Sequence, residues 1–525
     1  MSYQSLEFIL FSAAALIVYY AAGPRLQRYA LTAANLAFFI IAGAKYLPFI
    51  LVTTFVSFFC GRWIGKIYEN ADALIAGGDV VPKEIRAGAK AKAKRALAVA
   101  LVVDIGLLAV CKYTTFVLSN VNSVLNRLNI APVTIFNIIL PLGISFYTFM
   151  AVGYVLDIFW KRYKAETNFI LFADFLMYFP HVVQGPIDRY NEFKPQIENG
   201  IKLSYQNITF GAQLALWGFF KKLVVADRIG VFVDTVLGSW NEQNGIILIL
   251  AICVYSIQIY ADFSGCIDIV TGISEMFGIK LRKNFNHPYF SKTMAEFWRR
   301  WHMSLQEWFK DYVYYPVSIS KFVKKNKKRL AAKQMKRLES LFVTCYPILI
   351  VWIVTGVWHG AAWKYLAWGL FHASVLIFSE IMRPTFTKLA DKIKLDTDSY
   401  SWKLQQMLRT FIICCIGRVF FRANGLKAAL GIFKKMLTET TLSGITGFTA
   451  EMSGLSKPNI LVAVVSVIIL LTVDVIQENM PVRETLAKQG IIFRWLLIFL
   501  ALFSVIIFGM YGPGYNASSF IYAQF

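Results

Sequence analysis

The sequence has few charged residues: Asp, Glu, Lys and Arg make up 16% of it, whereas hydrophobic residues make up 57%. Soluble domains usually carry about a quarter charged residues and roughly 45–50% apolar ones. The composition therefore excludes an ordinary soluble globular protein. The apolar residues gather into long runs, several of which approach the roughly 17–25 residues needed to cross about 30 Å of hydrocarbon. The sequence predicts a polytopic membrane protein.

The motifs of several common chemistries are also missing. There is no G-x-x-x-x-G-K-[ST] phosphate loop and no H-E-x-x-H, which argues against nucleotide hydrolysis and zinc proteolysis. The seven cysteines form no C-x-x-C pair and no Cys/His spacing typical of zinc. Neither a metal site nor an acyl-cysteine intermediate is therefore predicted. No internal repeat is visible, which counts against an inverted-repeat transporter.

Acidic residues are scarce relative to basic ones, with 31 Asp and Glu against 54 Lys and Arg and a net charge of +23. Many basic residues lie in two linkers, "KEIRAGAKAKAKR" (83–95) and "KFVKKNKKRLAAKQMKR" (321–337). Basic loops between apolar spans are typical of the cytoplasmic side of a membrane, where they are attracted to anionic lipid. We therefore expect membrane lipid, and not nucleic acid, as the partner of these charges.

The apolar runs predict 11–13 crossings. The expected spans are 8–22, 29–43, 46–60, 97–118, 136–159, 168–183, 207–225, 245–262, 341–358, 362–381, 408–421, 459–475 and 491–511. Five of them separate the two basic linkers, yet an even number is needed to bring both linkers to the same side. Either one of the five does not cross, or the aromatic-rich region 263–316 supplies another passage. That region lacks a long apolar run and is expected to be interfacial or re-entrant.

One stretch in this region, "EFWRRWHMSLQEWFKDYVYYP" (296–316), combines tryptophans, arginines and a histidine. At about 100° per residue, one face of a helix over this stretch holds Trp298, Trp301, His302, Leu305, Trp308, Phe309 and Tyr312. The other side holds Arg299, Arg300, Glu307, Lys310 and Asp311. An aromatic face opposite a charged face predicts a helix lying at a membrane interface. His302, at the edge of the aromatic face, fits that interpretation less well.

A second stretch, "VTGVWHGAAWKY" (354–365), places His359 at the end of an apolar run, next to Trp358. An ionisable residue in or at the end of a span is costly and is a candidate for function, although a histidine satisfied by a backbone carbonyl is the structural alternative. The other histidines carry less signal: His181 lies in "FPHVVQGPIDRY", His287 precedes a proline in a turn, and packing explains His372.

Two such histidines, without a metal or a nucleophile triad, suit acyl transfer. A neutral imidazole can take a proton from a hydroxyl, which then attacks a thioester carbonyl. A second imidazole can orient the acceptor or stabilise the developing oxyanion.

The residues around these histidines resemble the membrane-bound O-acyltransferase (MBOAT) family. The resemblance is carried by "DFSGCIDIVTGISEMFGIKLRKNFNHPYFSKTMAEFWRRWHMSLQEWFKDYVYYP" (262–316) and "VTGVWHGAAWKYLAWGLFH" (354–372). The segments "YFPHVVQGPIDRY" (178–190), "RVFFRANGLKAAL" (418–430) and "FIYAQF" (520–525) look like the bacterial alginate O-acetyltransferase branch.

The resemblance implies catalytic roles for His359, as general base, and for His302. It implies donor or substrate binding for a wider set: Trp298, Arg299, Arg300, Trp301, Ser304, Asn284 and Trp358. The two arginines suit donor phosphates, with structural salt bridges as the alternative.

The implied fold is an all-α polytopic membrane protein, a ring of 11–13 tilted or re-entrant helices around a thinned centre with a through-membrane tunnel. A single domain, 1–525, would comprise N-terminal spans (1–135), a catalytic core (136–380) and C-terminal spans (381–525). It would lie in the bacterial cytoplasmic membrane and bind no cofactor. Acetyl-CoA would be the cytosolic co-substrate, and the acetyl group would pass to an extracytoplasmic polysaccharide, through an SGNH-hydrolase-like partner or directly.

Two departures keep alternatives open. The alginate branch continues into a glycine-rich "PLGGNR"-like segment, where this chain has "PVSISKFVKKNKKR" (316–329), and "GPIDRY" (185–190) is shared with the D-alanyl transferase branch. The alternatives are a D-alanyl transferase for teichoic acid with a carrier-protein donor, and a transporter of polysaccharide or lipid.

Overall fold

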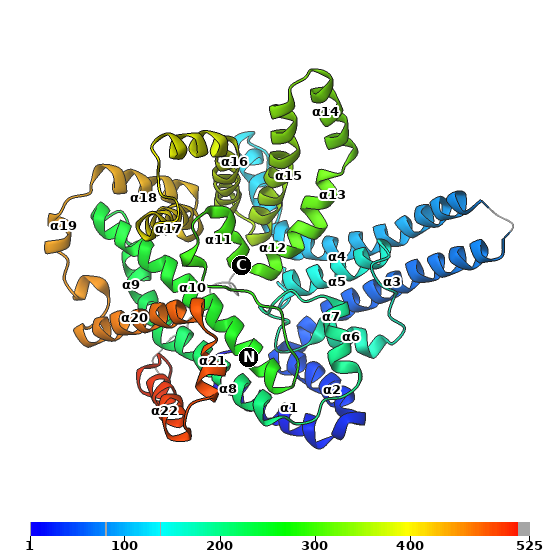
Figure 1. Cartoon of the computed structure of the whole chain (residues 1–525), viewed down its shortest axis with the longest axis horizontal. Coiled ribbons are helices and arrows are strands. Elements are labelled where there is room, and N and C mark those ends of the chain that lie inside the picture. Colours follow the sequence, from blue (N-terminus) through cyan, green and yellow to red (C-terminus); the bar gives the residue numbers. More distant parts are fainter. Residues whose placement is uncertain (1, 79–80, 137, 513–525) are drawn as a thin grey trace. The chain divides into compact units, whose positions relative to one another are not determined.

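The computed structural model describes residues 2–78, 81–136 and 138–512 (Figure 1); the segment 520–525 lies outside them. Within these ranges the protein is helical, with no β-strand and one isolated β-bridge. The α-helices are α1 Leu6–Ala21, α2 Gly23–Gly43, α3 Leu47–Ala76, α4 Pro82–Arg127, α5 Ile144–Phe159, α6 Phe169–Met177, α7 Tyr190–Glu198, α8 Tyr205–Phe219, α9 Asp227–Gly238, α10 Gly245–Met276, α11 Met294–Arg300, α12 Met303–Phe309, α13 Tyr315–Ser318, α14 Lys321–Ala332, α15 Lys336–His359, α16 Trp363–Lys392, α17 Tyr400–Arg422, α18 Leu426–Thr438, α19 Ser443–Thr446, α20 Lys457–Asn479, α21 Val482–Ala487 and α22 Ile491–Phe508. Two π-helical segments, Phe220–Ala226 and Lys310–Tyr314, follow α8 and α12.

The predicted polytopic membrane protein is confirmed. In the described part of the chain, nine helical stretches are long and apolar enough to cross a membrane, and two shorter helices, α1 and α5, are also apolar. The separately predicted spans 29–43 and 46–60 correspond to α2 and α3, which together form the first of the nine stretches. The ring and the tunnel stay predictions.

One predicted span, 168–183, is wrong. Only α6 forms there, and its nine residues are about 14 Å long, too short to cross the hydrocarbon core. The run is apolar because the protein itself buries it: α6 is buried from Leu171 to Met177. Its Asp174 accepts hydrogen bonds from Thr32 (3.0 Å) and Asn35 (3.1 Å) of α2. Removing this span leaves four between the basic linkers, so both linkers can lie on one side.

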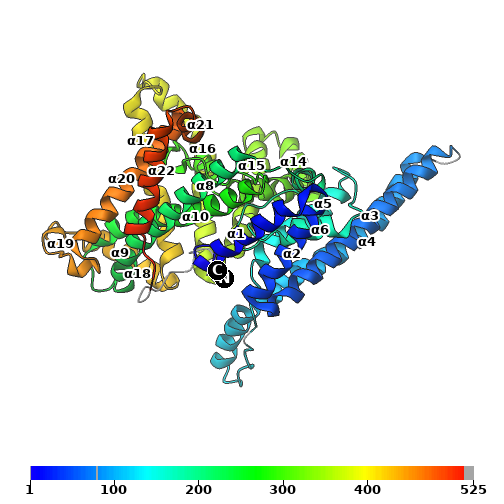
Figure 2. The same cartoon turned by 90° about the horizontal axis from the view of Figure 1, so that it is seen from below.

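The chain forms two compact units, Met1–Ala212 with Val270–Arg282, and Gln213–Ile269 with Lys283–Phe525. In the first unit, α3 and α4 lie side by side as a long hairpin, which both views show in blue (Figures 1 and 2). A buried hydrogen bond from Ser57 to the carboxylate of Asp104 (2.7 Å) crosses this hairpin.

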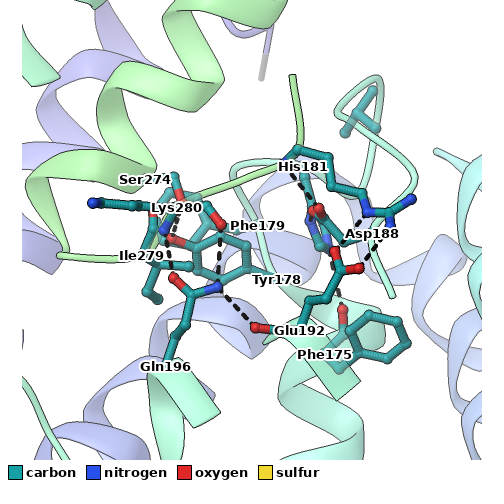
Figure 3. A network of polar contacts seen from close by, with 12 residues as sticks. Phe175, Tyr178, Phe179, His181, Asp188, Glu192, Gln196, Ser274, Ile279 and Lys280 are labelled. Atoms are coloured by element: carbon teal, nitrogen blue, oxygen red, sulfur yellow. Dashed lines mark hydrogen bonds and ion pairs between the residues drawn. The ribbon is translucent and has the colours of Figure 1, made fainter. Parts of the chain in front are cut away.

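The first unit also contains a polar network around the segment GPIDRY (Figure 3). The two ring nitrogens of His181 lie 3.0 Å from the carboxylate of Asp188 and 3.1 Å from the carbonyl oxygen of Phe175. Asp188 also accepts a hydrogen bond from the backbone N–H of Arg282 (3.1 Å). His181 is thus held on both sides by groups of the fold.

The same network ties the chain segment after α10 to α7. The side chain of Gln196 accepts from the backbone N–H of Lys280 (2.7 Å) and donates to its carbonyl oxygen (3.1 Å). Tyr178 and Ser274 share a hydrogen bond of 2.9 Å nearby (Figure 3). These side-chain contacts hold the irregular segment after α10 against α7.

In the second unit, α8 and its π-helical extension pack tightly on α10. A side chain at Gly218 would lie 2.6 Å from the carbonyl oxygen of Gly265, so only glycine allows this approach. Close beside it, the fully buried ammonium of Lys222 pairs with Asp262 (2.7 Å) and Asp227 (2.8 Å). A buried cation is tolerable only with such partners. These pairs hold α10 against the π-helical segment at the level of Phe263, which belongs to the candidate site.

Candidate active site

The segment 296–316 is not one helix. The helix α11 ends at Arg300, α12 begins at Met303, and His302 between them adopts a left-handed backbone conformation with φ 48° and ψ 54°. The prediction of a continuous helix is therefore wrong at this point. A non-glycine residue in that conformation costs roughly 1–2 kcal/mol, so the surrounding contacts must impose the break.

Asn284 supplies those contacts. Its backbone carbonyl accepts the N–H of Met303 (2.9 Å), and its side-chain oxygen accepts the N–H of Ser304 (3.0 Å). One residue further on, Phe285 forms the isolated antiparallel bridge with Trp301. Asn284, one of the predicted substrate-binding residues, thus caps α12 and presents His302. Ser304 is buried in the first turn of the same helix.

The aromatic face of this segment does not lie at an interface. Trp298, Trp301, Trp308 and Tyr312 are all buried inside the second unit, whereas Arg299 and Lys310 on the charged side are exposed. The interfacial interpretation is wrong for this face because the rings pack on other rings of the protein. Trp298, for example, lies 4.6 Å from Trp352, centroid to centroid.

His359 is the last residue of α15 and is 4% exposed. The chain turns immediately after it, and a side chain at Gly360 would collide with the ring of Tyr365. The imidazole lies between aromatic rings, with centroids 4.9 Å from Trp358 and 4.8 Å from Trp368. The sequence signal of a histidine at the end of a span therefore marks a buried, aromatic site.

Trp358 links the two predicted catalytic histidines. Its ring centroid lies 6.1 Å from that of His302 and 4.9 Å from that of His359. On its other side, His302 packs edge-on against Phe263 of α10, at 4.8 Å. The structure thus brings predicted residues from α11, from the turn at His302 and from the end of α15 together with two residues of α16, Trp368 and His372. We call this set the tryptophan–histidine cluster: Trp298, Trp301, His302, Trp358, His359, Trp368 and His372.

The burial of His302 has an electrostatic consequence. Only 1% of the residue is exposed, and desolvation lowers the pKa of its imidazole to about 3. Burial disfavours the charged form because the low-dielectric interior solvates it poorly. His302 is therefore neutral at physiological pH, as a proton acceptor or a hydrogen-bonding group for an acyl centre must be.

The two predicted phosphate-binding arginines have different surroundings. Arg300 is engaged in ion pairs with Glu296 (2.9 Å) and with Glu478 of α20 (2.5 Å), which matches the salt-bridge alternative. Arg299 is exposed on the surface of α11. Arg299 is thus the guanidinium left available to an anionic ligand.

His372 packs on aromatic rings, as expected from the sequence: its ring centroid lies 4.9 Å from those of Trp298 and Trp368. Another residue of this region, Arg418, has no role predicted from the sequence. Arg418 of α17 is 2% exposed and its guanidinium lies 4.4 Å from the ring centroid of Trp301. The segment RVFFRANG was noted only as a resemblance; a lone arginine inside an apolar span was the signal that marks Arg418.

We predict that Arg418 positions Trp301, and through it the turn at His302. Desolvated cation–π contacts contribute about 2 kcal/mol or more, so Arg418→Met should lower the transfer rate roughly 30-fold and shift the tryptophan emission spectrum. Arg418→Lys, which keeps the charge, should recover part of both. The matched control is Arg422→Met, one turn along α17, where the arginine pairs with Asp234 (2.6 Å) at the surface. Equal effects of the two Met variants would contradict this role.

Among the residues that the structure describes, no group of three or more His, Cys, Asp or Glu side chains is arranged to hold a metal ion.

Comparison with known proteins agrees with the geometry. Residues 161–332, which include His302 but end before His359, match the model of the membrane-bound O-acyltransferase family, MBOAT. A probable alginate O-acetylase AlgI of Pseudomonas syringae pv. tomato is 28% identical over 449 residues, covering 85% of this chain and 77% of that protein.

Two further relatives act in the cell envelope by name. A peptidoglycan O-acetyltransferase of Helicobacter pylori is 28% identical, covering 80% of this chain and 75% of that protein. A teichoic acid D-alanyltransferase of Bacillus subtilis is 29% identical, covering 54% of this chain and 69% of that protein. Together with the all-helical membrane fold, these matches identify a membrane-bound O-acyltransferase family domain over residues 161–332 and support an acyltransferase activity.

Proposed function

We propose that this protein transfers acetyl groups from acetyl-CoA to a hydroxyl destined for an extracytoplasmic polysaccharide, in the bacterial cytoplasmic membrane. The observation that carries the proposal is the tryptophan–histidine cluster, in which Trp358 joins the buried rings of His302 and His359. The relatives named as alginate and peptidoglycan O-acetylating proteins, matched over most of the chain, support acetyl as the group transferred.

In the proposed reaction, His359 is the general base. Its imidazole takes the proton of the acceptor hydroxyl as the oxygen attacks the thioester carbonyl, and the C–S bond then breaks. The proton passes from the imidazolium to the leaving thiolate, so the histidine returns to its neutral form. His302 donates a hydrogen bond to the developing oxyanion, a contribution that is strong in a water-excluded site. The surrounding indole rings exclude water that would otherwise hydrolyse the thioester.

Asn284 and Ser304 then belong to the support of His302 and not to the substrate site, because their contacts define the turn at that residue. Trp298, Trp301 and Trp358 form the walls of the site. The acetyl group leaves the protein on the outer side through a tunnel. It is accepted there by the polysaccharide or by an SGNH-hydrolase-like partner.

The second candidate is D-alanyl transfer to teichoic acid from a carrier protein. It is supported by the relative from Bacillus subtilis, whose match covers about half of this chain. Purified protein offered labelled acetyl-CoA and, separately, a D-alanyl-loaded carrier protein distinguishes the two. We expect label transfer from acetyl-CoA alone. Transfer only from the carrier protein would replace the proposed donor, and transfer from neither would contradict the enzymatic proposal.

We predict that Arg299 contributes to donor binding, whereas Arg300 contributes to stability. Arg299→Ala should raise KM for acetyl-CoA roughly 10-fold with little change in kcat, because a charge-assisted contact to phosphate contributes about 1.5–3 kcal/mol at most. Arg300→Ala, the matched control, should leave KM unchanged and lower the thermal midpoint, since Glu478 and Glu296 lose their partner. Steady-state kinetics with varied acetyl-CoA measures both. An unchanged KM for Arg299→Ala would remove this residue from the donor site.

A further inference from the structure

The basic helix α14 carries a regular stripe of lysines. Lys321, Lys324, Lys325 and Lys328 follow the spacing i, i+3, i+4, i+7, which places them on one face of the helix within about 100° of arc. All four are exposed. The helix begins cleanly because the hydroxyl of Ser320 caps the N–H of Val323 (3.3 Å). The stripe is thus held on a defined helix and is not a disordered basic tail.

Apolar contacts between α14 and α15 fix the level of this lysine stripe along α15. Phe322 lies 5.1 Å from Tyr346 and 6.1 Å from Phe342, centroid to centroid, and Val323 is 1% exposed. Figure 1 shows α14 and α15 side by side. The stripe therefore flanks the first turns of a membrane-spanning helix. At 1.5 Å per residue, Phe342 is about 25 Å from His359 along α15, so the stripe is remote from the tryptophan–histidine cluster.

Few acidic groups compensate these charges. The one ion pair of α14 in the described part of the chain joins Lys327 to Glu339 (4.0 Å), and Lys327 lies outside the stripe. Large apolar side chains in the same part of the chain, 315–338, are exposed: Tyr315 (51%), Ile319 (65%), Phe322 (53%) and Leu338 (51%). Lysines beside exposed aromatic and aliphatic groups, at the start of an apolar span, match the boundary between lipid head groups and acyl chains.

We propose that α14 is a docking site for anionic phospholipid, in which the lysine stripe binds head-group phosphates and the neighbouring apolar side chains enter the acyl region. The occupant is lipid rather than an acidic protein because the exposed apolar groups accompany the charges at the level where the span begins. The inference does not depend on the proposed acetyl transfer.

The test uses the full-length purified protein in mixed micelles, with phosphatidylglycerol or phosphatidylcholine added and the thermal midpoint recorded. Phosphatidylglycerol should raise the midpoint of the wild type, and 0.5 M NaCl should abolish the effect. Changing all four stripe lysines to Gln should raise the phosphatidylglycerol concentration needed for half of the effect at least about 10-fold. Changing them to Arg should preserve it.

Matched controls separate the stripe from net charge and from free phosphate. The Lys83→Gln, Lys90→Gln, Lys92→Gln, Lys94→Gln variant removes four positive charges from α4, in the other basic linker, and should lose less of the response than the stripe variant. The double variant Lys324→Gln, Lys328→Gln serves if the quadruple variant does not fold, and should show an intermediate loss. A wild-type response in the stripe variants, a loss confined to the α4 variant, or an equal effect of inorganic phosphate would each overturn the proposal.

Discussion

His359→Gln lowers acyl transfer by about 10³-fold or more, while the protein keeps its helicity and its behaviour on gel filtration. General acid–base catalysis by a positioned side chain contributes typically 10²–10⁴-fold. Loss of the base also ends the return of the proton to the leaving thiolate. The glutamine retains polarity and approximate size, so the indole rings of Trp358 and Trp368 stay packed. Single-turnover transfer from labelled acetyl-CoA measures the effect.

The matched control is His372→Gln, which alters another buried histidine in contact with Trp368. We expect its rate to fall less than 10-fold, since His372 has no assigned role in proton transfer. A comparable loss in both variants would mean that the cluster needs its histidines for packing. Transfer by folded His359→Gln protein at the wild-type rate would remove His359 from the reaction.

His302→Gln lowers kcat about 10²-fold with a smaller change in KM, because an oxyanion partner acts mainly in the transition state. Removal of one such donor costs about 10²–10³ in kcat in other enzymes. Steady-state kinetics with acetyl-CoA and acceptor varied separately distinguishes this result from weakened binding. A raised KM at unchanged kcat would assign His302 to ground-state binding.

The pH dependence of the thermal midpoint, compared between the wild type and His302→Gln, tests whether His302 is buried. The pKa of His302 is about 3 in the folded protein and near 6.5 in an unfolded chain. Between these values the unfolded chain binds a proton that the folded protein excludes, so acidification favours unfolding. The thermal midpoint of the wild type should therefore fall more steeply from pH 7 to pH 4.5 than that of His302→Gln. Parallel declines would show that the imidazole is not sequestered.

The sequence alone was sufficient for the membrane class, and with the family resemblance it predicts catalytic roles for His302 and His359, whose rings the structure places near Trp358. Apolar run length is a direct signal for spans, and a histidine between tryptophans in such a run is unusual enough to be noticed. The same signal failed at 168–183, because a run buried by protein and a run buried by lipid have the same composition. Only the hydrogen bonds from α2 to Asp174 show that the protein covers it.

The details of the site lay beyond the sequence for a different reason. The helical periodicity of a sequence predicts which residues share a face of a helix. Because α11 and α12 each follow this periodicity, the left-handed residue His302 between them cannot be recognised from the pattern. Asn284 enforces the break from 18 residues upstream of the histidine. Arg300 and Glu478 are 178 positions apart, and Arg418 reaches Trp301 from another helix. Such long-range pairs depend on tertiary packing.

The most direct test of the central account is a double-mutant cycle on single-turnover acetyl transfer, with His302→Gln, His359→Gln and the double variant. If the two histidines joined by Trp358 act as one catalytic unit, their effects are strongly non-additive. The double variant should then transfer acetyl about as slowly as His359→Gln alone. Rate losses that multiply would show that the two histidines act independently, and a folded double variant with wild-type transfer would place the chemistry elsewhere.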